Sequence, residues 1–286
     1  MANQRDIRRR IRSVQSTQKV TRAMKLEAAA RLRKAQERMM SARPYATRML
    51  QVLNSLATRA NPEDHPLLEA RGSERIEAVV ITADRGLCGA FNTNIIKRAQ
   101  QFLREQEGKV LTLHVVGRKG RDFFRRRNAN IVREHLNVSR KVEYAHAQRI
   151  GSDLVERYIA KELDAVYLIY NEFKSVVQQR LIVEQLLPIR KLETDEALAR
   201  QDYIYEPSSK ELLDRLLPKH VEYQVMRALL ESAAAEYGAR MSAMDAATKN
   251  AGDMIHGLTL TMNRVRQASF TREIIEVVSG ASSLKH

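Results

Sequence analysis

The chain contains few of the residues that build disulfide-stabilised, aromatic-rich or membrane-spanning proteins. It has no Trp, aromatic residues make up 5% of it, and Cys88 is its one cysteine. A lone cysteine excludes an intrachain disulfide framework and is typical of a reducing cytoplasm. No run approaches the roughly 18 apolar residues of a transmembrane helix. The N-terminus lacks the apolar stretch of a secretory signal, and its long regular pattern argues against a mitochondrial transit peptide.

The sequence also lacks the spacings that mark most catalytic and metal sites. Its seven His residues and its carboxylates follow no HExxH or CxxC pattern, so no metal site is predicted. No Ser lies in a nucleophile elbow, and Cys88 has no evident His partner. We therefore expect no catalytic residue, no cofactor and no metal in this chain, and we expect Cys88 to be a small buried thiol.

What the chain does contain is a long heptad repeat at its N-terminus. Alternating steps of four and three from Ile7 to Leu56 meet 15 positions, 12 of them apolar, and the polar exceptions are Gln18, Thr21 and Lys25. This pattern predicts a coiled-coil helix. Residues 1–60 hold 15 Lys and Arg against three acidic residues, a net charge of +12 in a chain whose total is +15. Such a helix suits either nucleic-acid phosphates or an acidic protein partner, and the coincidence of charge with heptads favours the protein.

The middle and the C-terminal part of the chain follow two further patterns. Short apolar runs alternate with amphipathic segments in the middle, and a second heptad seam leads from Tyr237 to Val265. The runs predict strands near 76–82, 110–116, 130–133, 165–170 and 180–186, with helices near 93–106, 118–127 and 141–162. Strands separated by helices indicate a parallel or mixed sheet covered on both faces.

The predicted fold class is α/β, with a long antiparallel two-helix coiled coil and a central Rossmann-like α/β domain. The N-terminal helix occupies residues 1–60, the α/β domain 75–190 and the C-terminal helix 207–286. The pairing of strands in the middle domain would bring the two long helices together. Residues 274–284 are apolar with one charge, so we expect either other subunits or the chain's own α/β domain to cover them.

Two glycine motifs leave other functions open. The turn around Gly86 and Gly89 follows a predicted strand and opens a helix, where an α/β enzyme would bind a nucleotide, but it has neither GxGxxG nor P-loop spacing. The basic Gly117–Gly120 segment is similar to the backbone-clamping GxxG loop of KH domains that bind RNA. Tight turns are the simpler interpretation of both. A nucleotide-binding enzyme and a nucleic-acid-binding coiled coil remain the alternatives to a protein-embedded helix.

Three segments carry a resemblance to a known family. IRRRIRSVQSTQKVTRAMKLEAAARL opens the chain, ITADRGLCGAFN lies in its middle, and ARMSAMDAATKNAGDMIHGLTLTMNRVRQASFTREIIEVVSGA closes it. With these segments the chain resembles the gamma subunits of bacterial F-type ATP synthases over essentially its full length. The cysteine insertion of chloroplast members is absent.

The resemblance implies the central rotor shaft of a rotary motor. In this family the two long helices lie in a ring of three alpha and three beta subunits, and the α/β domain binds the epsilon subunit and the c-subunit ring. Proton flow turns the c ring, and the shaft drives the catalytic beta subunits through their states. The resemblance therefore implies a non-catalytic subunit, peripheral to the cytoplasmic face of the bacterial cell membrane, with no nucleic-acid partner.

The resemblance also implies contact residues. Met24 and Lys25 match the segment that faces an acidic loop of beta, and Arg266 with Gln267 matches the pair that binds a second beta loop. Other matching positions are Thr271 and Glu273, in the coupling region opposite the first helix, and Tyr205 and Glu206, in the foot that contacts the c ring.

Overall fold

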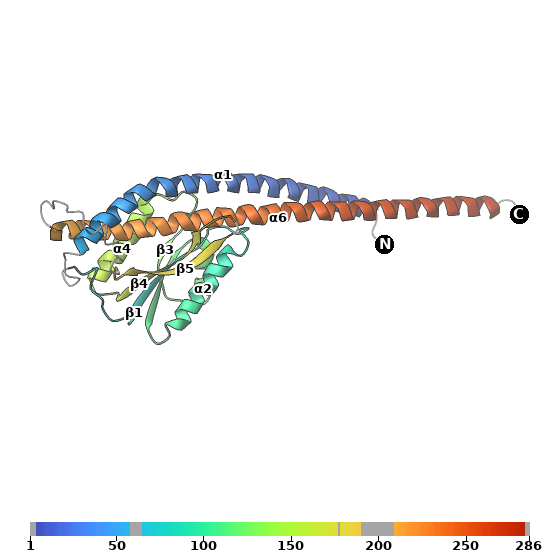
Figure 1. The fold of residues 1–286 in the computed structure, drawn as a ribbon. Helices are drawn as coiled ribbons and strands as arrows, with labels where there is room; N and C mark the ends of the chain where they lie inside the picture. The colour runs from blue at the N-terminus through green and yellow to red at the C-terminus, as the bar shows by residue number, and fades with distance from the viewer. Residues whose placement is uncertain (1–3, 58–64, 177, 190–208, 284–286) are drawn as a thin grey trace. The chain divides into compact units, whose positions relative to one another are not determined.

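The computed structural model describes residues 4–57, 65–176, 178–189 and 209–283. The chain divides into two compact units, one formed by Met1–Glu27 with Met241–His286 and the other by Ala28–Arg240. Two long helices, α1 (Gln4–Ala57) and α6 (Ser209–Ser283), contribute to both units (Figure 1). No helix of the described residues is long and apolar enough to cross a membrane.

In the smaller unit the two helices pack antiparallel along their predicted seams. Ile7 and Ile11 on α1 and Ala251 on α6 are buried, while most residues between the seam positions are exposed. From Thr21 to Lys25 along α1, the facing residue on α6 moves back from Thr248 to Asp245. This opposite progression confirms the predicted antiparallel coiled coil.

The pairing of the two helices ends before α6 does. Helix α1 begins at Gln4, which lies 17 residues before Thr21, and the same distance beyond Thr248 is Val265. Val265 is the last residue of the predicted C-terminal seam. Helix α6 continues to Ser283, beyond the level of Gln4, where α1 begins (Figure 1). The last turns of α6 therefore form a single helix.

The larger unit contains a five-stranded sheet with the order β3-β2-β1-β4-β5. The pairs β1–β2, β2–β3 and β1–β4 are parallel, and β4–β5 is antiparallel. The strands are β1 (Arg75–Ile81), β2 (Val110–Val116), β3 (Ile131–His135), β4 (Ala165–Phe173) and β5 (Gln179–Leu187). The sheet is therefore mixed, which agrees with the parallel or mixed sheet predicted from the alternating apolar runs and helices.

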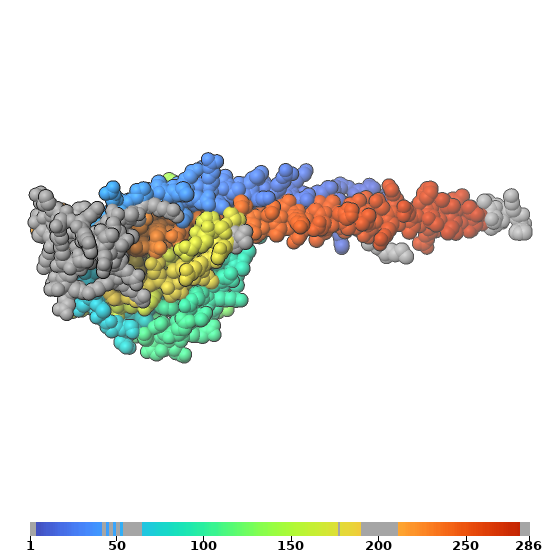
Figure 2. All heavy atoms as spheres, viewed as in Figure 1, coloured from blue at the N-terminus to red at the C-terminus, as the bar shows by residue number. Residues whose placement is uncertain are grey.

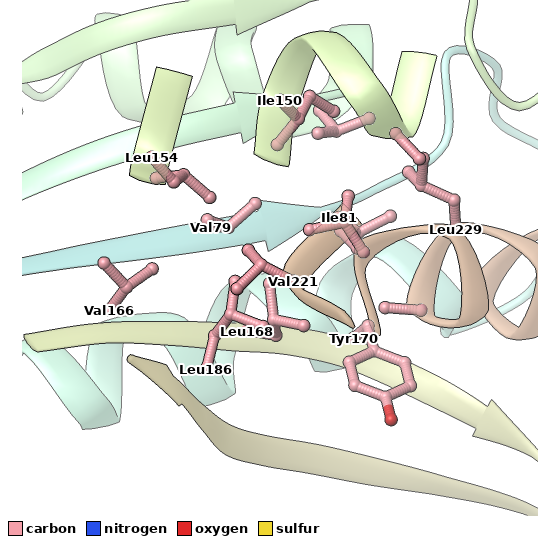
Figure 3. Close-up of a cluster of buried hydrophobic side chains, with 14 of the residues drawn as sticks. Val79, Ile81, Ile150, Leu154, Val166, Leu168, Tyr170, Leu186, Val221 and Leu229 are labelled. Carbon is pink, nitrogen blue, oxygen red and sulfur yellow. The ribbon is translucent and has the colours of Figure 1, made fainter. Parts of the chain in front are cut away.

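Helices cover both faces of this sheet. Helices α2 (Phe91–Glu105) and α3 (Arg118–Arg125) bury Phe91, Phe102 and Phe124 against one face. On the other face, α4 (Tyr144–Ile159) and α6 pack with α1 into a second core. Figure 3 shows residues of that core. Among them are Val79, Leu168, Ile150, Leu154, Val221 and Leu229. Both predicted layers of helices are present.

Helices α4 and α6 approach each other so closely at Gly151 of α4 that a side chain there would press on the backbone of α6. A Cβ placed on Gly151 would lie 3.0 Å from the Cα of Glu222 and 3.2 Å from its backbone nitrogen. Backbone atoms of a packed helix cannot move aside as a flexible side chain can. In contrast, a Cβ on Gly257 of α6 would meet no atom within 4 Å.

A charged cluster lies inside the larger unit, where the sheet meets α4. Glu77 of β1 is fully buried, and its carboxylate accepts hydrogen bonds from Arg157 at 2.6 Å and Thr112 at 3.2 Å. It lies 3.1 Å from the Nδ1 of buried His114. Burial raises the pKa of the Glu77 carboxyl, but the hydrogen bonds and charges of His114 and Arg157 outweigh it, so the net pKa is lowered. The cluster holds Glu77 ionised.

We expect opposite effects of one substitution at the two glycines. Gly151→Ala should destabilise the chain by about 1–3 kcal/mol, because the new methyl group overpacks the α4–α6 contact. Gly257→Ala should stabilise it by about 0.5–1 kcal/mol, because the site is open and helical. Urea unfolding of both variants measures the difference. A neutral or stabilising Gly151→Ala would contradict the close approach.

Removing the guanidinium from the buried cluster should be costly. Arg157→Met leaves the Glu77 carboxylate without its cation and should lower the free energy of unfolding by about 3–5 kcal/mol at pH 7. The lowered Glu77 pKa stabilises the fold above the unfolded pKa, and this contribution disappears as the pH falls through the folded pKa. The loss should therefore shrink in acid. The matched control is Arg98→Met, whose partly exposed pair with Glu105 should contribute less than about 1 kcal/mol.

Candidate functional site

Two of the polar breaks in the N-terminal seam, Gln18 and Thr21, form one hydrogen-bonded layer with Thr248 in the smaller unit. The hydroxyls of Thr21 and Thr248 lie 2.7 Å apart, and the Gln18 amide donates to the Thr248 carbonyl at 3.3 Å. One turn further, Lys25 forms an ion pair with Asp245 at 2.5 Å. Polar groups at seam positions fix the register of a coiled coil at a cost in stability. The breaks at 18, 21 and 25 thus select how the helices align.

Met24 and Lys25, two of the predicted contact residues, lie beside this layer. Both are half-buried, and the side chains of Lys25 and Asp245 are 40% and 63% exposed. The ammonium group of Lys25 is therefore open to solvent while it is bound to Asp245. A carboxylate of another protein would have to share Lys25 with Asp245, so the strength of such a contact depends on α6 as well as on α1.

The predicted residues of the C-terminal helix lie on its single-helix end. Arg266, Gln267, Thr271 and Glu273 are all exposed. The Thr271 hydroxyl donates to the Gln267 carbonyl at 3.0 Å, and Glu273 accepts from Ser269 at 3.2 Å. Since the pairing with α1 ends near Val265, Thr271 and Glu273 have no described α1 residue opposite them. Tyr205 and Glu206, the predicted c-ring contacts, lie outside the described residues.

This end of α6 also exposes apolar side chains. The exposed large residues are Phe270, Ile274, Ile275, Val277 and Val278, with Val277 71% exposed. Residues 266–280 are all exposed, and Figure 2 shows this part of α6 uncovered on the face in view. The described residues of the smaller unit leave these side chains uncovered. A helix with so many exposed apolar residues is typical of one that binds a partner.

The apolar residues do not continue the seam that faces α1. Steps of four and three beyond Val265 reach Ser269, Arg272, Glu276 and Ser279, which are polar. Phe270, Ile274 and Val277 instead share a different face, because their spacing of four and three places them one above the other on a helix. We call this second face the terminal stripe (Phe270, Ile274, Val277 and Val278). It would not face α1 even if the pairing of α1 with α6 continued further. It suits another protein.

The turn around Gly86 is committed to internal contacts. Asp84 accepts hydrogen bonds from the backbone of Arg118 at 3.1 Å and Asn137 at 2.9 Å, and Arg240 of α6 donates to the Gly86 carbonyl at 3.2 Å. Asn92 accepts from the backbone of Ala83 at 2.9 Å. These contacts bring α6 to the carboxyl end of β1, where an α/β enzyme would place its nucleotide. The turn acts here as a joint between the sheet and α6.

The second glycine motif also has a packing explanation. Gly117 has a φ of 93°, and a Cβ on it would lie 2.1 Å from the Thr82 carbonyl oxygen. The backbone N–H of Gly120 donates to the Thr82 hydroxyl at 2.9 Å, and a Cβ there would lie 2.8 Å from the same oxygen. Both glycines are required by the close approach of Thr82, so the segment needs no nucleic acid to account for it.

One group of described residues has the composition of a metal site. Potential ligand atoms of Glu77, His114 and Asp153 lie within 4.8 Å of one another. No local spacing predicts this group, because its three residues come from β1, β2 and α4. Arg157 binds Glu77 at 2.6 Å, and Arg133 binds Asp153 at 3.1 Å. Each carboxylate is thus already neutralised by a guanidinium, and a divalent cation would meet two positive charges. The cluster is better explained as an ion-pair network.

Sequence reasoning missed the residues of α6 that complete these contacts. Thr248 was predicted only as a seam position and completes the polar layer, while Asp245 pairs with Lys25 beside it. Glu236 and Arg240 form a 2.6 Å ion pair beside the Gly86 turn. The spacing of four between Glu236 and Arg240 is a signal for such a pair. Burial raises the pKa of the Glu236 carboxyl, while Arg240 lowers it in part. No local signal connects either residue with the turn.

Comparison with known proteins gives consistent matches. The family model described as ATP synthase matches residues 3–284. The ATP synthase gamma chain of Pelotomaculum thermopropionicum is 49% identical over 285 residues, covering 100% of both chains. That of Solibacter usitatus is 52% identical over 282 residues, covering 97% of this chain and 98% of the relative.

Solved structures share the fold at lower identity. A chain of the Euglena gracilis mitochondrial ATP synthase, in a structure of OSCP/F1/c-ring, matches with a TM-score of 0.69 and 21% identity, over 98% of this chain and 94% of that one. A chain of the Tetrahymena thermophila central stalk/c-ring structure matches with a TM-score of 0.62 and 24% identity, over 80% and 99%. With close relatives aligned over their whole length, this chain belongs to the ATP synthase gamma chain family.

Proposed function

We propose that this chain is the central rotor shaft of an F-type ATP synthase. It couples proton-driven rotation of the c-subunit ring to conformational change, and so to ATP synthesis or hydrolysis, in a ring of three alpha and three beta subunits. It carries no catalytic residue for that reaction itself. The observation that supports this most directly is the single-helix end of α6, whose exposed terminal stripe needs enclosure by other subunits.

The proposed contacts divide between two groups of subunits. Met24, Lys25, Arg266, Gln267, Thr271 and Glu273 contact beta subunits, and Tyr205 and Glu206 contact the c ring. The epsilon subunit binds the α/β part, and the complex is peripheral to the cytoplasmic face of the bacterial cell membrane. The division into residues 1–60, 75–190 and 207–286 stays a prediction.

The charge of the chain supports an acidic surrounding. Residues 1–60 carry a net +12, and their three carboxylates cannot neutralise it. Lys25 is bound to Asp245 and Arg33 to Glu37, in both cases through a pair with exposed side chains. Pairs of this kind hold their partners weakly and can exchange them. An acidic ring of subunits would add the missing charge.

Co-assembly and rotation test the function. The chain, mixed with alpha and beta subunits, should form a complex that hydrolyses ATP, and a probe attached to its α/β part should rotate while ATP is supplied. Ile274→Ser with Val277→Ser should weaken retention of alpha and beta at least tenfold, because burial of each side chain contributes about 1.5–3 kcal/mol. The isolated double variant should be as stable as the parent, since both residues are exposed.

The matched control for that experiment is Val110→Ser. Val110 is also an exposed apolar residue, at 61%, but it begins β2 in the larger unit. The Val110→Ser substitution should leave the retention of alpha and beta subunits unchanged. A chain that fails to assemble with alpha and beta would overturn the proposed function. Retention that is equal in the double variant and the control would show that the terminal stripe is not enclosed.

The pair between Lys25 and Asp245 gives a prediction on salt dependence. Asp245→Asn frees Lys25 for the carboxylates of beta, while the isolated chain should lose less than about 1 kcal/mol. ATP hydrolysis by the assembled complex should become more sensitive to ionic strength, because salt screens exposed charges. Measurement of the rate from low to physiological salt checks this. Asp253→Asn, an exposed acidic position on the same helix, serves as control. Parallel salt curves for all three forms would exclude a contact through Lys25.

A further inference from the structure

A cavity of about 390 Å³ lies in the larger unit between the edge of the sheet and α6. Its apolar walls include Leu168 of β4 and Ile182 and Leu186 of β5. Two polar residues of α6, His220 and Gln224, complete it. Its volume is within the range of about 300–1,000 Å³ that is typical of binding sites. We call this feature the β5 groove.

The strand that borders the groove lies at the edge of the sheet. Strand β5 is the last strand of the sheet, and no other described strand pairs with its outer edge. Its segment Leu181–Val183 is apolar on both faces, because Leu181 and Val183 pack on one core and Ile182 on the other. Natural proteins usually guard such edges with Pro, Lys or a bulge that twists the edge away. Strand β5 has such an irregularity at its end, where its register with β4 shifts between Val166 and Tyr167. The stretch Gln179–Gln185 pairs regularly and contains neither Pro nor Lys, although it includes Arg180 and Glu184.

The α6 wall presents one donor and one acceptor without partners. Gln224 Nε2 lies 3.3 Å from His220 Nε2, so one nitrogen of the imidazole and one atom of the amide are used. The remaining atoms, His220 Nδ1 and Gln224 Oε1, are buried without a hydrogen-bond partner. Exchanging the amide oxygen and nitrogen reverses the roles but still leaves one donor and one acceptor. Unpaired buried polar atoms of this kind destabilise a fold.

The groove has no free charge to attract an ion. Burial, with a smaller effect of Arg227, lowers the pKa of His220 to about 4, so the imidazole is neutral at pH 7. Glu184, the acidic residue of the lining, accepts from Arg227 at 2.6 Å and from the Tyr170 hydroxyl at 3.1 Å. The groove therefore suits a neutral group that both donates and accepts hydrogen bonds.

We infer that the β5 groove binds an extended, uncharged and apolar segment of another polypeptide, which adds to β5 as a sixth strand. An extended peptide offers main-chain N–H and C=O groups both to the edge of β5 and to His220 and Gln224, and it places alternate side chains in the cavity. A small molecule could fill the cavity but would leave the strand edge unpaired. The inference rests on the proposed function, because that places other subunits around this chain.

Hydrogen exchange of the β5 amides tests this. In the complete purified complex, amides of residues 179–187 should exchange at least tenfold more slowly than in the isolated chain, because the partner strand binds their outer edge. His220→Phe with Gln224→Leu should remove this protection. The isolated double variant should be no less stable than the parent, because the substitutions replace unpaired polar atoms by apolar ones. Gln224→Leu alone is the second variant if the phenylalanine does not fit.

The control is Arg215→Gln, an exposed position of the same helix. It should leave both stability and protection unchanged. Equal exchange of β5 in the complex and the isolated chain would overturn the inference, whether the groove is empty or filled by the chain itself. So would a small molecule found bound to the isolated chain by native mass spectrometry, or protection that survives in the variants. A chain that does not assemble at all refutes the proposed function instead.

Discussion

The fold depends on one helix, α6, that packs against the sheet and two other helices at once. Within the larger unit, α6 contributes to a single core with the sheet, α4 and α1, so its residues there must be buried nearly all round. The sequence meets this demand with small residues, among them Ala228, Ala233, Ala234 and Gly238. A Cβ on Gly238 would lie 3.2 Å from the Phe173 ring, which shows how little space remains. Because other elements pack closely on several sides of α6, small residues fit at these positions where larger side chains would overlap their neighbours.

In the smaller unit the same helix follows different rules. Its contacts with α1 combine apolar seam residues with the polar layer of Gln18, Thr21 and Thr248, which contributes alignment more than stability. Beyond Val265 its apolar residues move to another face, where nothing in the described chain meets them. One continuous helix therefore passes from a dense core, through a specified pair, to an unpaired surface. Each change follows from where the apolar residues lie on the helix.

Local sequence patterns predicted the elements, because periodicity is a local property. The heptads from Ile7 and from Tyr237 marked the seams, and each apolar run of the middle domain became a strand within a few residues. Contacts between distant segments were not predictable. The Arg240–Gly86 hydrogen bond, the Glu77 cluster and the Lys25–Asp245 pair each join residues far apart in sequence, and such side chains look like ordinary surface charges until the fold brings them together.

The single-helix end of α6 has a mechanical consequence. Two helices packed side by side resist bending and twisting more than one, because their mass lies further from the common axis and their side chains interlock. Stiffness therefore drops beyond the residues of α6 that face Gln4, where α1 begins, and the final turns of α6 form a more flexible tip. The paired section of α1 and α6 can transmit torque, while the single end of α6 bends to fit the subunits around it. The terminal stripe would then hold the end of α6 in position among those subunits and would not itself transmit torque.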